Sequence, residues 1–105
     1  LGVCRGMQMI NSYLGGTLAP VQEHVATRHR VRFPHTTAEV NSYHNGGMFE
    51  ENLAGDLEIL AQSEDGVIEA IRTKHLLGMM WHPEREENPT SIDLYMLRMF
   101  LKDLS

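Results

Sequence analysis

The chain has 105 residues, of which 42% are apolar and 22% charged, and its formal net charge is −5. This size and composition predict one globular domain with a modest core. A single cysteine excludes an internal disulfide and favours a reducing, cytoplasmic setting, while the lack of a basic stripe or a long apolar run argues against nucleic acid and membrane as partners.

The first twenty residues predict a strand followed by a helix. Residues 1–3 are typical of the end of a buried strand. Over residues 5–14 apolar side chains recur near a period of 3.6, which predicts a helix, and the two glycines at 15–16 are of the type that commonly ends one. We expect a short strand over 17–19 and a loop from Pro20.

The middle of the chain predicts strands interrupted by turn residues. Residues 28–33 alternate weakly, as an edge strand or one arm of a hairpin does, and residues 39–43 are a second candidate strand. The Asn-Gly-Gly run at 45–47 is expected to break regular structure, and residues 49–53 to form one or two helical turns.

The remaining third of the chain predicts a hairpin, a strand and a helix. Strands over 57–63 and 67–73 flank a turn, and a third apolar run over 76–81 stops before a proline. Helix-start residues at 88–91 precede an amphipathic pattern that runs to Leu104. One strand–helix unit followed by several strands and a last helix predicts an α/β domain.

The segment Gly2-Val3-Cys4-Arg5-Gly6 has the pattern of a nucleophile elbow, with cysteine in place of serine. We expect the two glycines because so tight a turn leaves no room for large neighbours. The turn places Cys4 at the positive end of a helix, which favours a thiolate, and directs the Arg5 N–H to where an oxyanion forms. The alternative is a buried cysteine that packs as a small apolar residue.

His82 and Glu84 are the candidate base and its orienting carboxylate. In an extended segment residues two apart point to the same side, so Glu84 can accept the imidazole N–H and leave the other ring nitrogen to take a proton from Cys4. The alternative is a surface histidine near a carboxylate. We favour catalysis because an elbow cysteine and a late His-x-Glu rarely occur together by chance.

Two motifs, Gly2-Val3-Cys4-Arg5-Gly6-Met7-Gln8 and Trp81-His82-Pro83-Glu84, resemble those of the class I glutamine amidotransferases and the related gamma-glutamyl hydrolases. The resemblance runs over the whole chain, from Leu1 to about Leu104. It implies a flavodoxin-like α/β fold with a central, mainly parallel sheet. It also implies a catalytic triad of Cys4, His82 and Glu84.

The resemblance implies substrate-binding residues as well. Gln8 matches a glutamine that helps to bind the γ-glutamyl group. Ser42, Tyr43 and His44 match the segment that lies beside the substrate. The alternative for Gln8 is a solvated helix residue, and for His44 a buried histidine bonded to backbone.

The activity implied is hydrolysis of the γ-amide of glutamine, or of a γ-glutamyl amide, through a cysteine thioester. The motifs are closest to the branch that includes gamma-glutamyl-gamma-aminobutyrate hydrolases. One alternative is a glutaminase subunit that supplies ammonia to a separate synthetase partner. Another is a non-catalytic remnant that binds or regulates a partner, which the intact triad disfavours.

The family's glycine-rich oxyanion loop, which precedes the nucleophile, is not in this sequence. We therefore expect residues 1–105 to be the C-terminal portion of one such domain, truncated at the N-terminus, and to be poorly stable and nearly inactive alone. The alternative is a small complete domain.

Six histidines raise the question of a metal site. His24, His29 and His35 lie close together in the sequence, but their spacing does not give a paired helical site and the chain offers no second cysteine. We expect no metal and no cofactor.

Overall fold

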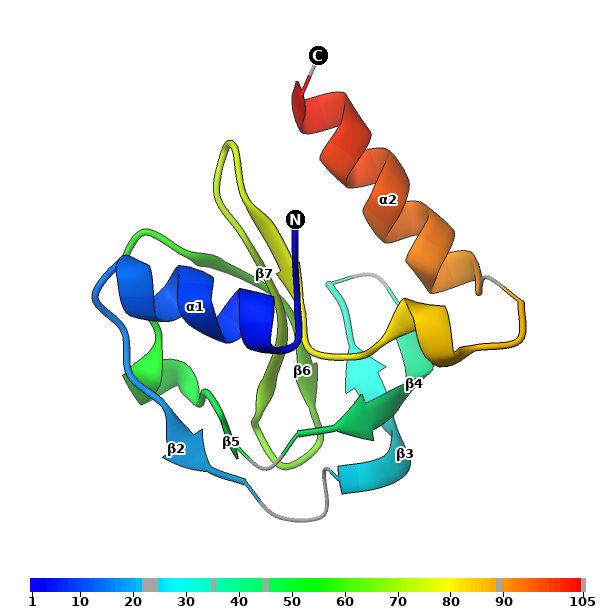
Figure 1. Ribbon diagram of the computed structural model, residues 1–105, viewed down its shortest axis with the longest axis horizontal. Coiled ribbons are helices and arrows are strands. Elements are labelled where there is room, and N and C mark those ends of the chain that lie inside the picture. The colour runs from blue at the N-terminus through cyan, green and yellow to red at the C-terminus, as the bar shows by residue number, and fades with distance from the viewer. Residues whose placement is uncertain (22–24, 35, 45, 89, 105) are drawn as a thin grey trace.

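The computed structural model describes residues 1–21, 25–34, 36–44, 46–88 and 90–104. A curved sheet forms the centre, with helices packed against it (Figure 1). The elements in chain order are β1 (Gly2–Val3), α1 (Arg5–Tyr13), β2 (Ala19–Pro20), β3 (Val25–Arg32), β4 (Thr37–Tyr43), β5 (Gly46–Gly47), η1 (Glu50–Asn52), β6 (Glu58–Ser63), β7 (Ile68–Arg72), β8 (Leu77–Met79), η2 (Pro83–Arg85) and α2 (Ser91–Leu104).

The main sheet has the strand order β1-β8-β7-β6-β3-β4. Strands β1 and β8 are parallel, with Gly2 opposite Gly78 and Val3 opposite Met79. The other four described pairings of this sheet are antiparallel, so the expectation of a mainly parallel sheet is wrong for this part of the fold. The reason is the connections: short turns join β3 to β4, β6 to β7 and β7 to β8, and a parallel pair needs a long crossover.

Helix α1 lies against one face of the sheet (Figure 1), and two glycines let it approach closely. A Cβ atom at Gly2 would stand 2.6 Å from the Gly6 carbonyl carbon, and one at Gly78 would stand 2.8 Å from Cγ of Met7. These two glycines are partners in the parallel pair. Their missing side chains let Met7 bury completely against β8, which fixes the position of the helix start.

Helix α2 packs on the opposite face through Met96, which is fully buried, and through partly buried Ile92, Met99 and Phe100. The helix begins where the sequence predicts: the Asp93 N–H donates to the Thr90 hydroxyl and the Asp93 carboxylate accepts from the Thr90 N–H, which is a capping box. Strand β8 alternates between the two cores, since Leu77 and Met79 face α2 while Met80, just beyond it, faces α1.

Two local predictions are wrong. The strand expected over 17–19 is instead β2 at Ala19–Pro20, and the predicted breaker contains its partner, β5. Asn45 of that breaker lies outside the described residues. A pair of two-residue strands needs few ladder hydrogen bonds, so proline and glycine are compatible with it.

The predicted helix over 5–14, the hairpin 57–73 and the helical turn within 49–53 are confirmed. Residues 28–33 fall mostly within β3, a hairpin arm that pairs on both sides and is therefore not an edge strand. No described helix is long and apolar enough to cross a membrane.

Candidate active site

Cys4 occupies the turn between β1 and α1. Its backbone angles, φ 53° and ψ −104°, make it the one described non-glycine residue with positive φ. Such a conformation is costly for an L-residue and is common at nucleophile elbows. The Cys4 N–H donates to the Met79 carbonyl oxygen at 2.7 Å, which ties the turn to the end of β8.

The two glycines of the elbow motif have different roles. Gly2 is required, because any side chain would collide with the backbone of Gly6. At Gly6 itself an added Cβ would meet no atom within 4 Å, so the expectation that both positions lack room is wrong for Gly6. Gly6 matters instead through its backbone, which occupies the space that a side chain at Gly2 would need.

The half-buried thiol of Cys4 has its pKa raised, first by burial and further by the nearby carboxylates of Glu69 and Glu84. The Arg5 backbone N–H, which donates to the sulfur, and the Arg85 guanidinium oppose that rise. Burial prevails, so the net effect on the Cys4 pKa disfavours the thiolate that the helix start was expected to favour. A nucleophile at this position needs a base to take its proton.

The imidazole of His82 lies three residues beyond β8, at the sheet edge where Cys4 also leaves its strand. Its Nδ1 is 2.6 Å from Oε2 of Glu84. A carboxylate only accepts, so Nδ1 carries the hydrogen, and in the neutral ring Nε2 is then the nitrogen with the lone pair. The contact is made across the 3₁₀ turn η2, with Pro83 in its first position, and not along an extended segment as expected.

The carboxylate of Glu84 is 61% exposed, whereas the His82 ring is 17% exposed. Burial raises the pKa of Glu84, but the hydrogen bond from His82 and the nearby charge of Arg85 outweigh it and hold that pKa below its usual value. Glu84 therefore stays ionised beside His82 at neutral pH.

Asn41 of β4 is a site residue that the sequence did not predict. Its amide Nδ2 donates to the His82 carbonyl oxygen, and its Oδ1 accepts from the His82 N–H, both at 2.8 Å. The amide also contacts Glu86, which is bound to Arg28 at 2.7 Å. These contacts lower the pKa of Glu86, mainly through Arg28. The available signal for Asn41 was its place in the sequence, directly before the predicted substrate-side residues Ser42, Tyr43 and His44.

Tyr43, two residues along the same strand, packs its ring edge-on to the His82 ring, with centroids 5.9 Å apart. The Arg85 guanidinium lies 4.1 Å over the centroid of the Tyr43 ring. The predicted residue Tyr43 is thus beside His82. Ser42, the residue between Asn41 and Tyr43, is fully buried.

His44 and Gln8 meet at one backbone group. The Gln8 amide donates to the Gly46 carbonyl oxygen at 3.0 Å, and Nδ1 of His44 lies 3.0 Å from the same oxygen. Gln8 is therefore tied to β5 and is not simply a solvated helix residue. His44 is 4% exposed, as the buried-histidine alternative predicts. Its Nε2 lies 3.7 Å from the fully buried carboxylate of Glu69, a strand residue that the sequence analysis missed.

His29 also faces Glu69, at 3.4 Å. No metal-binding group of three or more histidine, cysteine or acidic side chains is found among the described residues. His24 and His35, the other members of the predicted histidine trio, lie outside those residues.

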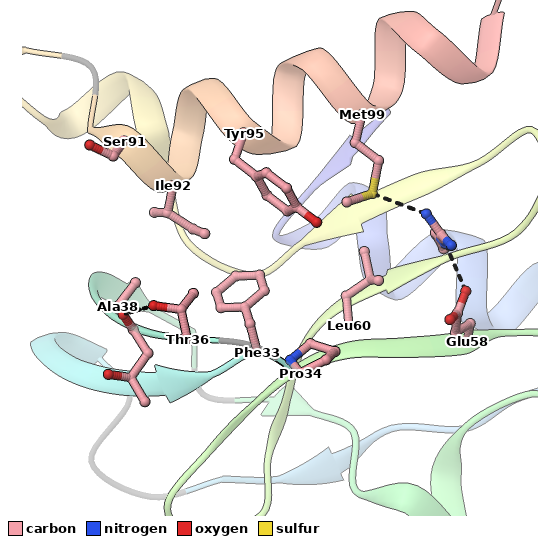
Figure 2. Close-up of a pocket in the computed structure, with 12 residues that line it drawn as sticks. Phe33, Pro34, Thr36, Ala38, Glu58, Leu60, Ser91, Ile92, Tyr95 and Met99 are labelled. Carbon is pink, nitrogen blue, oxygen red and sulfur yellow. Dashed lines mark hydrogen bonds and ion pairs between the residues drawn. The ribbon is translucent and has the colours of Figure 1, made fainter.

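A cavity of about 670 Å³ lies between α2 and the sheet, away from these side chains (Figure 2). Figure 2 shows Phe33, Leu60 and Tyr95 around it, with Met99 at one end. The Arg72 guanidinium donates to the Met99 sulfur at 3.4 Å. None of the predicted site residues lines it.

Fold and site together define an α/β protein with a cysteine on a strand–helix elbow and a His–Glu pair just beyond the end of the neighbouring parallel strand. The chain belongs to the glutamine amidotransferase class-I family, whose sequence model matches residues 1–104.

Individual relatives agree with this assignment. The gamma-glutamyl-CDP-amidate hydrolase of Campylobacter jejuni is 38% identical over 90% of this chain and 46% of its own length. A glutamine-hydrolysing GMP synthase of Thermomicrobium roseum is 32% identical over 99% of this chain and 21% of its own length. The crystal structure of a glutamine amidotransferase from Thermotoga maritima superposes with a TM-score of 0.69 at 16% identity, covering 98% of this chain and 46% of that one. The chain thus spans less than half the length of these proteins.

Proposed function

We propose that Cys4, His82 and Glu84 act as a catalytic triad that hydrolyses the γ-amide of glutamine or of a γ-glutamyl amide. The observation that carries this proposal is the β1–β8 parallel pair. It brings the elbow cysteine and the His82–Glu84 pair to one edge of the sheet, with an N–H donor directed at the sulfur.

The first half of the reaction forms a thioester. Nε2 of His82 takes the proton of the Cys4 thiol while Sγ bonds to the γ-carbonyl carbon, and the Arg5 N–H stabilises the oxyanion. The C–N bond then breaks as His82 returns the proton to the departing amine. Glu84 holds the imidazole in the tautomer that both transfers need.

The second half releases glutamate. His82 takes a proton from water while the water oxygen attacks the thioester carbonyl carbon. The C–S bond then breaks, and the sulfur of Cys4 takes the proton back from His82. We further propose that Gln8, Ser42, Tyr43 and His44 line the γ-glutamyl site. The tie between Gln8, His44 and Gly46 supports this, because it joins the helix of the nucleophile to the segment after β4.

A second candidate function is ammonia supply to a synthetase. The relative that supports it is the glutamine-hydrolysing GMP synthase of Thermomicrobium roseum. In that case glutamine is the preferred substrate and a partner domain receives the ammonia. The hydrolase reading has the support of the Campylobacter jejuni relative, whose name specifies a γ-glutamyl amidate.

Glutamate release from glutamine and from γ-glutamyl ethylamide, measured with the intact protein, tests the proposal. We expect Cys4→Ala to abolish release, and the exposed α1 variant Ser12→Ala to retain it. Undiminished turnover in Cys4→Ala rules out the mechanism. A large preference for glutamine that grows when a synthetase is added favours the ammonia-supplying role.

A further inference from the structure

Glu69 is a carboxylate inside the fold that the proposed reaction does not use. It lies in β7 and is fully buried. Its Oε1 is 3.4 Å from Nε2 of His29, and its Oε2 is 3.7 Å from Nε2 of His44. Burial of a carboxylate is costly even beside such partners, so an acid here contributes little to stability. Its effect on the arrangement of its partners is the more promising role.

Each ring nitrogen of His44 faces an oxygen atom. Nδ1 lies 3.0 Å from the Gly46 carbonyl oxygen, and Nε2 faces Glu69. A carbonyl oxygen only accepts, so the first contact is a hydrogen bond when Nδ1 carries hydrogen. An ionised Glu69 favours hydrogen on Nε2 for the same reason. The imidazolium form meets both requirements, and the carboxylate balances its charge. Glu69 thus lets His44 donate from both nitrogens.

The Gly46 carbonyl connects His44 to Gln8. The Gln8 side-chain Nε2 donates to this oxygen at 3.0 Å. Because a carbonyl only accepts, it selects the nitrogen end of the Gln8 amide and leaves Oε1 to accept from another group. Gln8 belongs to the helix of the nucleophile, where its N–H donates to the Cys4 carbonyl oxygen at 3.1 Å. A chain of contacts therefore runs from Glu69 in the sheet to the first turn of α1.

Glu69 also lies close to the reaction centre itself. Its carboxylate is one of the groups that raise the pKa of the Cys4 thiol. Its backbone oxygen accepts from the N–H of Met80 at 2.8 Å, two residues before His82. The buried acid is therefore next to both motifs of the site and is well placed to act on one of them through His44.

We propose that Glu69 is a positioning residue for the γ-glutamyl site, where its carboxylate holds His44 as the donor that fixes the Gly46 carbonyl together with Gln8. This inference rests on the proposed function, in which Gln8 and His44 line that site. It assigns Glu69 to binding of the γ-glutamyl group, and loss of such binding raises KM more than it lowers kcat. Direct action of the Glu69 charge on Cys4 is the alternative, and the test separates the two.

Steady-state hydrolysis of γ-glutamyl ethylamide by the intact protein provides the test. Glu69→Gln keeps the size of the side chain and removes its charge. We expect KM to rise about tenfold, the effect of one charge-assisted hydrogen bond, while kcat changes little. KM does not depend on the fraction of folded protein, so a loss of stability alone does not produce this result. His29→Gln is the matched control, since it removes the other histidine beside Glu69 and should leave KM unchanged.

A double-mutant cycle shows whether Glu69 acts through His44. His44→Asn removes the ring that faces Glu69, so Glu69→Gln should have no further effect on KM in that background. The same rise in both backgrounds, an equal rise in His29→Gln, or an unchanged KM in Glu69→Gln overturns the inference alone. Failure of the wild-type protein to hydrolyse the ethylamide overturns the proposed function together with it.

A measurement on the wild-type protein keeps the inference testable if Glu69→Gln does not fold. NMR of the histidine ring nitrogens, with the His44 signals assigned by their loss in His44→Asn, shows which nitrogens carry hydrogen. We expect hydrogen on Nδ1 of His44 at neutral pH. A bare Nδ1, with hydrogen on Nε2 alone, would mean that His44 does not donate to Gly46, and this would overturn the inference.

Discussion

The side-chain amide of Asn41 pairs with both backbone groups of His82, donating to its carbonyl oxygen and accepting from its N–H at 2.8 Å each. Strand β8 ends at Met79, so His82 has left the ladder that would otherwise satisfy these groups. A side chain from the opposite end of the sheet order thus fixes the backbone from which the candidate base projects. Glu84 fixes the ring and Asn41 fixes the peptide.

We expect Asn41→Ala to lower kcat more than it raises KM. Loss of the amide leaves the His82 N–H and carbonyl without their partner, which costs about 1–3 kcal/mol of stability. Displacement of the imidazole by a fraction of an ångström to 1 Å lowers the rate by roughly 10- to 100-fold. Steady-state kinetics and thermal melting of the same preparation provide both quantities.

Asn11 is the matched control for this prediction. It is also a buried asparagine, and in the described part of the chain its amide bonds to backbone alone, at Thr17, Asn52 and Ala54. None of these three is a candidate site residue. Asn11→Ala should lose similar stability while each folded molecule keeps its kcat. If both variants lose activity only in proportion to unfolding, Asn41 has no positioning role.

The two members of the His82–Glu84 pair should differ in importance. His82→Ala removes the group that moves the proton, which costs about 100- to 10,000-fold in kcat/KM. Glu84→Gln should cost much less, because the carboxylate only orients the ring and is 61% exposed, so that water can replace it. Comparison of kcat/KM for the two variants decides the roles, and equal or reversed losses would contradict them.

The pH dependence of Cys4 alkylation should shift in opposite directions in two variants. Iodoacetamide reacts with the thiolate, so the rate rises with pH through the pKa of Cys4, which burial raises above the ordinary value. Arg85→Gln removes a charge that lowers this pKa and should move the inflection to higher pH. Glu84→Gln removes a charge that raises it and should move the inflection to lower pH. Shifts of the same sign would show that these charges do not act on the thiol.

The two elbow glycines should tolerate alanine differently. Gly2→Ala forces a Cβ to within 2.6 Å of backbone in α1 and should greatly destabilise the protein or prevent folding. Gly6→Ala meets open space at a helical position and should stabilise the fold by about 0.5–1 kcal/mol. Chemical denaturation of the two variants tests this, and a stable Gly2→Ala protein would be incompatible with the close approach of α1.

Local patterns predicted the elements that bear the site. Apolar spacing gave the helix after Cys4 and the strand before His82, because each element buries a regular stripe against the sheet. The His82–Glu84 contact was also predictable, since residues two apart are within reach in several backbone conformations. The 3₁₀ turn that makes the contact was not, because the alternation rule assumes an extended chain.

The sequence patterns could not predict contacts between segments that lie far apart in the chain. Asn41 meets His82 across 41 residues, and the exposed-looking acid Glu69 is fully buried in β7 beside His29 and His44. The strand order that creates these neighbours depends on which hairpins stack, and no single-sequence pattern encodes it. The same limit explains why the paired glycines Gly2 and Gly78 could not be matched beforehand.

The central claim is that Cys4 carries the γ-glutamyl group as a thioester. Acid quenching of the intact protein during turnover of a γ-glutamyl amide, followed by peptide mass spectrometry, measures this directly. We expect the peptide that contains Cys4 to gain the mass of one γ-glutamyl group in the wild-type protein, and not at all in Cys4→Ala. Continued release of glutamate by Cys4→Ala, or turnover by the wild-type protein with the adduct on another residue, would contradict the account.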